Sequence, residues 1–363
     1  MLNQKVFTRL LLQWNQHDNK RRMPWKGEKD PYKVWLSEVI LQQTRVEQGW
    51  GYYEKFITAY PCIQKLAAAQ DEEVFKLWEG LGYYTRCRNL LHTARMIVEK
   101  YSGNFPDDYD SIAGLKGIGS YTASAIASFC FDLPHAVIDG NVLRVTARFF
   151  GIDKPVDSTE GKKFFAGLAQ TCLDKKNPAG YNQAIMDFGA TICKPAPLCH
   201  VCPLSKHCKA FQLKQVSCLP VKSSQLKKRG RWFSYFIFIA DDKKFVQQRT
   251  GQDIWQHLYE FYLVETENDP EWTSKKIRSW LRKHLNIDLT ASIRIISAKS
   301  QKLTHRIING YFIEVELFSV PSVLKGGANW ITENAITGKA FPRFIHQYLS
   351  AKNTGASTFL SLN

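Results

Sequence analysis

The chain has 363 residues, and 49 lysines and arginines against 33 aspartates and glutamates give it a formal net charge of +16. This length predicts two domains, and this basicity predicts a polyanionic partner, nucleic acid before a membrane surface. No stretch reaches membrane-spanning length, and the odd number of nine cysteines, four of them clustered, is not a secreted disulfide framework. We therefore expect a soluble, cytoplasmic protein.

Helical patterns fill residues 1–220, where apolar residues recur at intervals of three and four between turn signals. Asp30 is expected to cap a helix that begins at Pro31. From Val34 to Leu41 this helix is apolar on nearly all sides, so Glu38 is expected to be buried. An unpaired buried carboxyl tends to stay protonated and could act as a general acid, whereas an ion pair with an arginine would make it structural.

A Gly-x-Gly turn follows in the segment LKGIGSYTASAIASF. Gly117 and Gly119 allow a tight hairpin, and a helix is expected to open at about Ser120. The free amides and positive dipole end of that helix would grip a phosphate. The motif alone fits an ordinary interhelical turn equally well.

Asp139 is the second candidate acid, in VIDGNVLRV after an apolar run and before a glycine. A carboxylate in such a position is more often a helix cap or a turn residue than a reacting group. From the residues alone, capping is therefore the default role.

Four cysteines form the pattern Cys-x5-Cys-x2-Cys-x5-Cys, at Cys193, Cys199, Cys202 and Cys208. Four thiolates within sixteen residues suit a tetrahedral zinc or a four-iron cluster, and the spacing does not choose between them. His200 and His207 are expected to be bystanders.

No acidic residue occurs between Phe188 and Ala240, and this run contains a basic linker at 221–230. An α+β domain is expected over 231–349, with β-type alternation, a turn at Asn309-Gly310, and helices at Thr273–Leu285 and around Phe344–Leu349. Residues 350–363 are expected to be a tail.

In combination these motifs resemble the helix-hairpin-helix DNA glycosylases that include endonuclease III. The resemblance implies an all-α domain in which Asp139 stabilises the positive charge that develops on the deoxyribose. It also implies a [4Fe-4S] cluster on the four cysteines, although the family pattern has six residues in the first gap where this chain has five. Members that also cut the strand carry a lysine where this chain has Ser120, so a monofunctional enzyme is expected.

The segment SEVILQQT resembles the signature of adenine DNA glycosylases of the MutY family. By this resemblance Glu38 protonates adenine, Gln43 enters the duplex and Thr44 contacts the damaged guanine. GLGYYTRCRNL resembles the family's wedge loop, which makes Tyr83 the intercalating residue and leaves Tyr84 to the core. The residues that are further implied to line or order the adenine pocket are Trp25, Tyr121, Asn141 and Gln183.

DIWQHLYEFYLVE resembles the second domain of that family, which is related to 8-oxoguanine triphosphate hydrolases. No cluster of glutamates typical of Nudix hydrolases follows, so a Nudix-like recognition domain without hydrolase activity is expected. Its 8-oxoguanine motif matches Leu303, Thr304 and His305, where Leu303 cannot stack as an aromatic residue would. Thr304 could still offer a hydroxyl, or could be an ordinary strand residue.

The resemblance therefore implies a monomeric bacterial enzyme, associated with the nucleoid, that removes adenine mispaired with 8-oxoguanine or guanine in double-stranded DNA. One alternative is a glycosylase for another lesion, such as thymine opposite guanine or an oxidised pyrimidine. A second is a catalytically silent iron-sulfur protein that senses mismatches. The pair Glu38 and Asp139 argues against the second, and the LQQT segment and second domain argue against the first.

Overall fold

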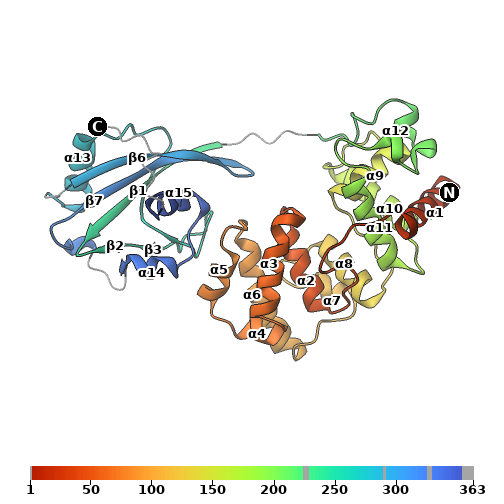
Figure 1. Cartoon of the computed structure of the whole chain (residues 1–363), viewed down its shortest axis with the longest axis horizontal. Coiled ribbons are helices and arrows are strands. Elements are labelled where there is room, and N and C mark those ends of the chain that lie inside the picture. The colour runs from red at the N-terminus through yellow and green to blue at the C-terminus, as the bar shows by residue number, and fades with distance from the viewer. Residues whose placement is uncertain (1, 224–228, 289–291, 325–328, 354–363) are drawn as a thin grey trace. The chain divides into compact units, whose positions relative to one another are not determined.

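The structure is a computed structural model that describes residues 2–223, 229–288, 292–324 and 329–353 (Figure 1). It divides into two compact units, the first formed by Met1–Ala69 and Arg88–Gln225 and the second by Gln70–Cys87 and Leu226–Asn363. Residues 224–228 of the expected linker and 354–363 of the expected tail lie outside the described part. Within the described part, no helix is long and apolar enough to cross a membrane.

The first unit is helical, as its apolar periodicity predicts. Its helices are α1 (Leu2–His17), α2 (Pro31–Leu41), α3 (Val46–Ala59), α4 (Ile63–Ala68), α6 (Thr85–Tyr101, which starts in the second unit), α7 (Tyr109–Ala113), α8 (Ser120–Phe131), α9 (Gly140–Phe150), α10 (Thr159–Cys172), α11 (Pro178–Thr191) and α12 (Lys209–Gln212), with 3-10 turns η1 (Cys199–Val201) and η2 (Ser205–His207).

Local capping chemistry explains where the helices that carry the candidate residues begin. The Asp30 side chain accepts a hydrogen bond of 2.9 Å from the Tyr32 amide, and Pro31 is the first residue of α2. Helix α8 begins at Ser120, with Gly119 as its N-cap. Both starts confirm the predictions from the sequence, because both depend on residues within one turn of the boundary.

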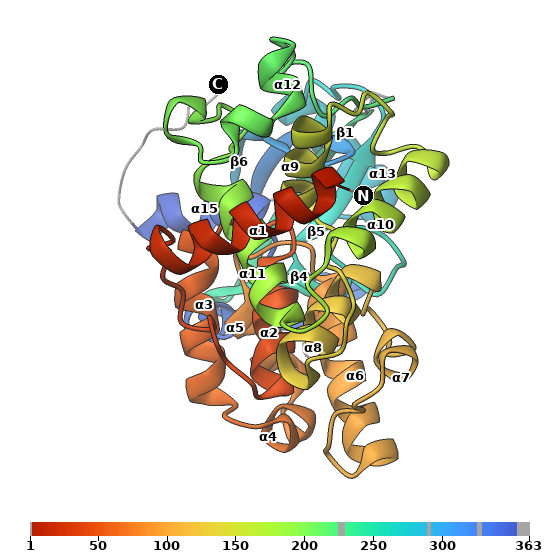
Figure 2. The same cartoon turned by 90° about the vertical axis from the view of Figure 1, so that its right-hand side faces the viewer.

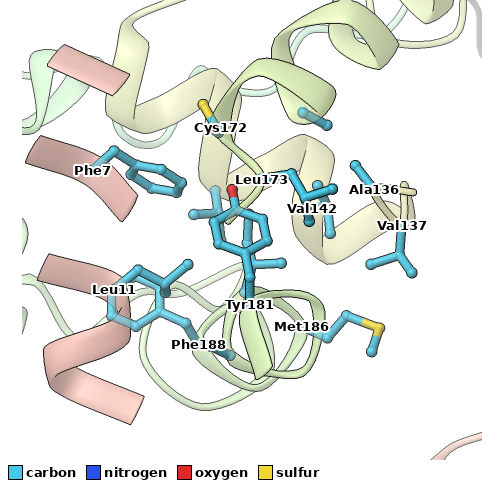
Figure 3. Packing of buried hydrophobic residues seen from close by; sticks show 14 of the residues in the cluster. Phe7, Leu11, Ala136, Val137, Val142, Cys172, Leu173, Tyr181, Met186 and Phe188 are labelled. Atoms are coloured by element: carbon cyan, nitrogen blue, oxygen red, sulfur yellow. The ribbon is translucent and has the colours of Figure 1, made fainter. Parts of the chain in front are cut away.

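The core of the first unit lies where α1 packs against α11, as Figure 2 shows. Phe7 and Leu11 of α1 point into the cluster shown in Figure 3, beside Tyr181 and Phe188 of α11. These four side chains are at most 2% exposed, and burial of each contributes about 1.5–3 kcal/mol. The cluster fixes α11 beneath the N-terminal helix.

Helices α9 and α11 approach each other closely at Gly189. A Cβ atom at this position would lie 2.6 Å from the Asn141 Cβ, well inside contact distance. Glycine therefore lets the N-terminal turn of α9, which begins at Gly140, lie directly against α11.

The second unit is built on a sheet that, in the described part, has six strands in the order β6-β7-β1-β2-β8, with β5 pairing with β1. Strand β1 runs parallel to β7 and antiparallel to β2 and β5. The elements of this unit are α5 (Asp71–Trp78), β1 (Arg229–Ala240), β2 (Lys243–Phe245), β3 (Gln247–Gln248), β4 (Tyr259–Glu260), β5 (Tyr262–Thr266), α13 (Ser274–Leu285), β6 (Ser292–Lys302), β7 (Arg306–Glu316), η3 (Ser322–Leu324), β8 (Trp330–Thr332), α14 (Glu333–Thr337) and α15 (Arg343–Asn353).

Strand β1 is covered on both faces, which explains its nearly continuous apolar sequence. Phe233 and Tyr235 pack in the cluster that includes Phe344 of α15. Phe236, on the opposite face, packs with Leu281 of α13. One helix therefore covers each face of the sheet (Figure 1). Strands mixed with helices confirm the expected α+β class of this part of the chain.

Helix α13 runs from Ser274 to Leu285, which confirms the helix predicted at Thr273–Leu285, and Thr273 is its N-cap. Helix α15 runs to Asn353, so the first residues of the expected tail at 350–363 are helical. That tail therefore starts later than the sequence suggested.

The expected turn at Asn309-Gly310 is wrong, because both residues lie inside β7. The turn instead spans Leu303–His305, where the Leu303 amide donates to the Arg306 carbonyl at 2.8 Å. Gly310 serves a different purpose, since a Cβ there would lie 1.8 Å from the Phe233 carbonyl oxygen of the paired strand.

Residues 70–87 belong to the second unit although the sequence places them among the helices of the first. Glu72 accepts hydrogen bonds from the Tyr259 hydroxyl at 2.7 Å and from Lys339 Nζ at 2.8 Å. Glu79 Oε1 accepts one of 2.8 Å from the Phe341 amide. These partners are far away along the chain, so no local pattern could predict the association.

Candidate active site

A cavity of about 420 Å3 in the first unit brings together most of the candidate residues. It is formed by α2, α8, α9 and α11 and by the segment that precedes α2. The candidates that line it are Trp25, Glu38, Thr44, Tyr121, Asp139, Asn141 and Gln183. Residues distant in sequence therefore meet at one concave surface, as a catalytic site requires.

Glu38 projects from α2 into this cavity and is 6% exposed, which confirms the predicted burial. Burial, and to a smaller extent the negative charge of Asp139, together raise the pKa of Glu38 to about 7, although the Tyr121 hydroxyl partly opposes this. The carboxyl group therefore carries a proton in a large fraction of molecules at neutral pH. A group in this state can donate a proton to a leaving base.

Asp139 is both the N-cap of α9 and a wall of the cavity. Its Oδ1 accepts a 2.7 Å hydrogen bond from the Val142 amide, and its Oδ2 accepts one of 2.7 Å from Asn141 Nδ2. Burial raises the pKa of Asp139, while these hydrogen bonds lower it. The capping role expected from the residues is therefore present, and it holds the carboxylate in a fixed orientation toward the cavity.

Arg144, which the sequence did not single out, fixes the amide of Asn141. Its NH2 donates to Asn141 Oδ1 at 2.7 Å, and its Nε donates to the Cys193 carbonyl at 2.7 Å. Because Asn141 Oδ1 is held by a donor, its Nδ2 must face Asp139. The i, i+3 spacing of 141 and 144 on one helix was the available signal for this contact.

The Gly-x-Gly hairpin lies outside the lining of the cavity. Gly117 has a φ of +80°, and a Cβ there would lie 2.6 Å from the Asn89 Cβ, so only glycine suits the position. Gly119 has open space around it, and no side chain caps the amides at the start of α8, which begins at Ser120. These amides and their dipole suit an anion such as a phosphate.

Gln43 and Thr44 follow the end of α2. Gln43 is exposed with a φ of +58°, an uncommon conformation for a residue other than glycine, whereas Thr44 lines the cavity. Such backbone outliers gather at functional sites.

Tyr83 and Thr304 meet within the second unit. Tyr83 is 45% exposed with a φ of +49°, and its hydroxyl lies 2.6 Å from the Thr304 hydroxyl. Tyr84 is 6% exposed, which confirms that it belongs to the core. Thr304 lies at the tip of the β6-β7 hairpin rather than in a strand, and His305 beside it is exposed.

The four clustered cysteines line one small cavity of about 30 Å3 among apolar side chains such as Ile192 and Phe211. Arg148, 4% exposed, holds the loop around them by donating to the carbonyls of Lys194 at 2.6 Å and Pro195 at 3.0 Å. Burial raises the pKa of Cys193, and Arg148 lowers it. Among the residues described, no three His, Cys, Asp or Glu side chains are grouped so that they could hold a metal ion.

Comparisons with known proteins bear on this site. Residues 36–166 match the family described as HhH-GPD superfamily base excision DNA repair protein, a range that contains Glu38, the hairpin and Asp139. The chain is 35% identical to the adenine DNA glycosylase of Buchnera aphidicola subsp. Baizongia pistaciae, over 87% of this chain and 88% of the relative. It is 42% identical to that of Mus musculus over 59% of this chain, which spans only 44% of the mouse protein.

Among solved structures, the chain resembles a thermostable thymine-DNA glycosylase with a TM-score of 0.54 and 29% identity. The match covers 58% of this chain and 97% of that one. A match that leaves out two-fifths of the chain is consistent with a glycosylase fold joined to a further domain.

Proposed function

Because this chain belongs to the family of adenine DNA glycosylases of base excision repair, and so is a DNA N-glycosylase, we propose that it excises adenine mispaired with 8-oxoguanine or guanine in duplex DNA and leaves the strand intact. The observation that carries this proposal is Glu38, a buried carboxyl with a pKa of about 7 in the cavity that Asp139 also lines. Two carboxyl groups with different environments can divide acid and charge-stabilising roles.

The reaction follows from the positions of these two groups. Adenine that is turned out of the duplex enters the cavity, where Glu38 donates a proton to the ring and makes it a better leaving group. The bond between base and sugar breaks, and the positive charge on the deoxyribose is stabilised by Asp139, whose orientation Asn141 maintains. Water then adds to the sugar and completes the hydrolysis. The Tyr121 hydroxyl, which donates to Met186 Sδ at 3.4 Å, lies close enough to Glu38 to lower the pKa of its carboxyl group, and Trp25 offers an aromatic wall for the base.

The absence of strand cleavage is supported by the amines around the cavity. Residue 120 is a serine, which cannot form a Schiff base with the sugar. Lys26 and Lys29 line the cavity, but each is paired with a carboxylate, Asp187 at 2.8 Å and Asp132 at 3.3 Å. A lysine held as an ammonium ion by a carboxylate is a poor nucleophile.

We assign binding of the duplex to two parts of the chain. The hairpin Gly117–Ser120 would bind a phosphate, and Gln43 would enter the base stack. Thr44 would contact the partner base, and Tyr83 would intercalate. The exposed positions and left-handed backbones of Gln43 and Tyr83 support these roles.

Recognition of 8-oxoguanine is assigned to the Nudix-like domain, residues 231–349, through Thr304 and His305. Support comes from the position of Thr304 at an exposed hairpin tip beside Tyr83, where a hydroxyl can reach a base. Without an aromatic residue at 303, stacking must come from elsewhere, and Tyr83 is the neighbour able to supply it.

We further propose a [4Fe-4S] cluster bound by Cys193, Cys199, Cys202 and Cys208. The donor set has the right chemistry, because all four thiols line one apolar cavity, although they are not grouped in the described structure as a bound metal would require. Burial raises the pKa of Cys193, and the neighbouring Arg148 partly offsets this and favours the thiolate. When bound, the cluster would brace the basic loop Lys206–Lys209 for contact with phosphates. Iron, sulfide and zinc analysis of the purified protein tests this, and stoichiometric zinc without iron would refute it.

The activity is tested with purified protein and duplexes that carry adenine opposite 8-oxoguanine, guanine or thymine. We expect alkali-labile sites at adenine opposite the first two bases. A duplex with thymine opposite guanine tests the alternative substrate, and no alkali-labile site in any duplex would refute the assignment.

A further inference from the structure

Asp187 is a fully buried carboxylate on α11 whose two oxygens are saturated with hydrogen bonds. Its Oδ1 accepts from Arg21 NH1 and from Gln183 Nε2, both at 2.9 Å. Its Oδ2 accepts from Asn19 Nδ2 and from Lys26 Nζ, both at 2.8 Å. A carboxylate offers about four acceptor positions, so all of them are used.

The side chains that donate to Asp187 belong largely to the wall of the cavity. Arg21, Lys26 and Gln183 line the cavity, and Trp25, another lining residue, directly precedes Lys26. The segment 19–26 has no regular secondary structure, so these bonds hold it against α11 in place of a helix or sheet ladder.

Burial of a charge with two cations contributes little to net stability, because desolvation offsets the attraction. An apolar side chain at position 187 would hold the two elements together at lower cost. The buried charge of Asp187 is therefore better explained by the side chains that it orients than by a contribution to the stability of the fold.

We propose that Asp187 is a positioning residue that makes the site selective for adenine by locking the amide of Gln183. An ionised carboxylate can only accept hydrogen bonds, so it takes Gln183 Nε2 and leaves the carbonyl oxygen Oε1 as the polar atom for a ligand. Among the residues described, none donates to that oxygen. An acceptor matches the 6-amino group of adenine, whereas a 6-oxo purine would oppose it with a second acceptor.

This inference rests on the proposed function, and its test measures discrimination rather than activity alone. Single-turnover excision of adenine and of hypoxanthine, each opposite 8-oxoguanine, gives a ratio of rate constants. In Asp187→Asn the four donors face one carbonyl group, Gln183 loses its fixed orientation, and we expect the ratio to fall by about tenfold or more. In a Gln183→Ala background, Asp187→Asn should leave the ratio unchanged, because Asp187 acts through Gln183.

Asn182 offers a matched control on the same helix. It is also fully buried and binds backbone and side-chain partners, the Val137 amide at 3.1 Å and Ser128 Oγ at 2.9 Å, but it does not line the cavity. Asn182→Ala should lower the melting temperature and leave the ratio unchanged. If Asp187→Asn does not fold, the double variant Asp187→Asn/Lys26→Met allows the same measurement, because it also removes the Lys26 ammonium group that would have lost its carboxylate partner.

The outcomes separate the two proposals. If the wild-type chain releases no adenine from any duplex, the proposed function fails and the role of Asp187 fails with it. If the wild type releases adenine but Asp187→Asn slows both substrates equally, the function stands and Asp187 is only a structural ion-pair partner.

Discussion

Asn141 donates a 2.7 Å hydrogen bond to Asp139 Oδ2, while the other carboxylate oxygen caps α9 through the Val142 amide. Asp139 therefore combines a structural role, as a helix cap, with a chemical role, as the charged group of the cavity. Substitutions at Asp139 and at Asn141 separate the two roles. Asp139→Asn keeps an efficient cap, since asparagine caps helices as well as aspartate does, but removes the negative charge. We expect it to retain binding to a mismatched duplex in a gel-shift assay and to lose turnover.

Loss of binding in Asp139→Asn would assign the residue to structure alone. Asn141→Ala provides the complementary measurement, because it frees Asp139 without removing the charge. Its single-turnover rate constant should fall roughly tenfold or more, with little change in binding.

Excision should depend on pH through Glu38, whose pKa is raised by burial to about 7. A general acid acts in its protonated form, so the single-turnover rate constant should decrease as pH rises through about 7. Glu38→Gln lacks the proton and should be slower by roughly a hundredfold or more, without this dependence. The range from pH 6 to pH 8 extends roughly one pH unit on each side of the pKa. A wild-type rate constant that stays level over this range would contradict the role of Glu38 as the general acid.

The same carboxyl should reduce the stability of the fold at high pH. Its pKa is about 7 when folded, against an ordinary value of 4.5, so the folded state binds more protons between these values and stability falls as pH rises through that window. The difference between about 7 and 4.5, at about 1.4 kcal/mol per pH unit, predicts a loss of roughly 3–4 kcal/mol. Glu38→Gln should therefore unfold at a higher urea concentration than the wild type at pH 8, and this difference should shrink at pH 5, about 0.5 unit above the ordinary pKa of a glutamate.

Borohydride should not trap a covalent complex between the wild-type chain and DNA, because residue 120 is a serine and the two lysines of the cavity are paired. The measurement is a denaturing gel after reaction with a substrate duplex. Lys29 is the more exposed of the two amines, so any trapped band should be compared with Lys29→Met. Efficient trapping that depends on Lys29 would make the enzyme bifunctional.

Thr304→Val removes a hydroxyl at the hairpin tip and keeps the shape of the side chain. We expect the ratio of rate constants for adenine opposite 8-oxoguanine and opposite guanine to fall, by an amount typical of one lost hydrogen bond, about three- to tenfold. Tyr83→Phe is the control for Thr304→Val, because it removes the Tyr83 hydroxyl that contacts Thr304 and leaves the Thr304 hydroxyl in place. A ratio unchanged in Thr304→Val would remove this residue from recognition of the partner base.

Sequence patterns predicted what depends on neighbours in the chain. Asp30 and Pro31 begin α2, and Ser120 begins α8, because capping chemistry acts within a single turn. Burial of Glu38 followed from an apolar helix face, which is also a local property.

Apart from the shared pocket that the family resemblance implied, contacts between distant segments were not predicted. The donors to Asp187 lie 4 to 168 residues away, and only Gln183 falls within a helical repeat. Asn309-Gly310 has the composition of a turn but lies in a strand, because the close approach of Phe233 requires a glycine there. In both cases tertiary packing determined the outcome, and local propensity was overridden.

The association of residues 70–87 with the second unit has a consequence for how this protein can be divided. A fragment cut at the basic linker would keep Glu72 and Glu79 but lose Lys339, Tyr259 and Phe341, to which they bind. The segment that presents Tyr83 would then be left without its support, although its own residues were all retained. The domain boundary along the sequence differs from the boundary between the two packed units, so a cut at the linker does not yield two self-contained domains.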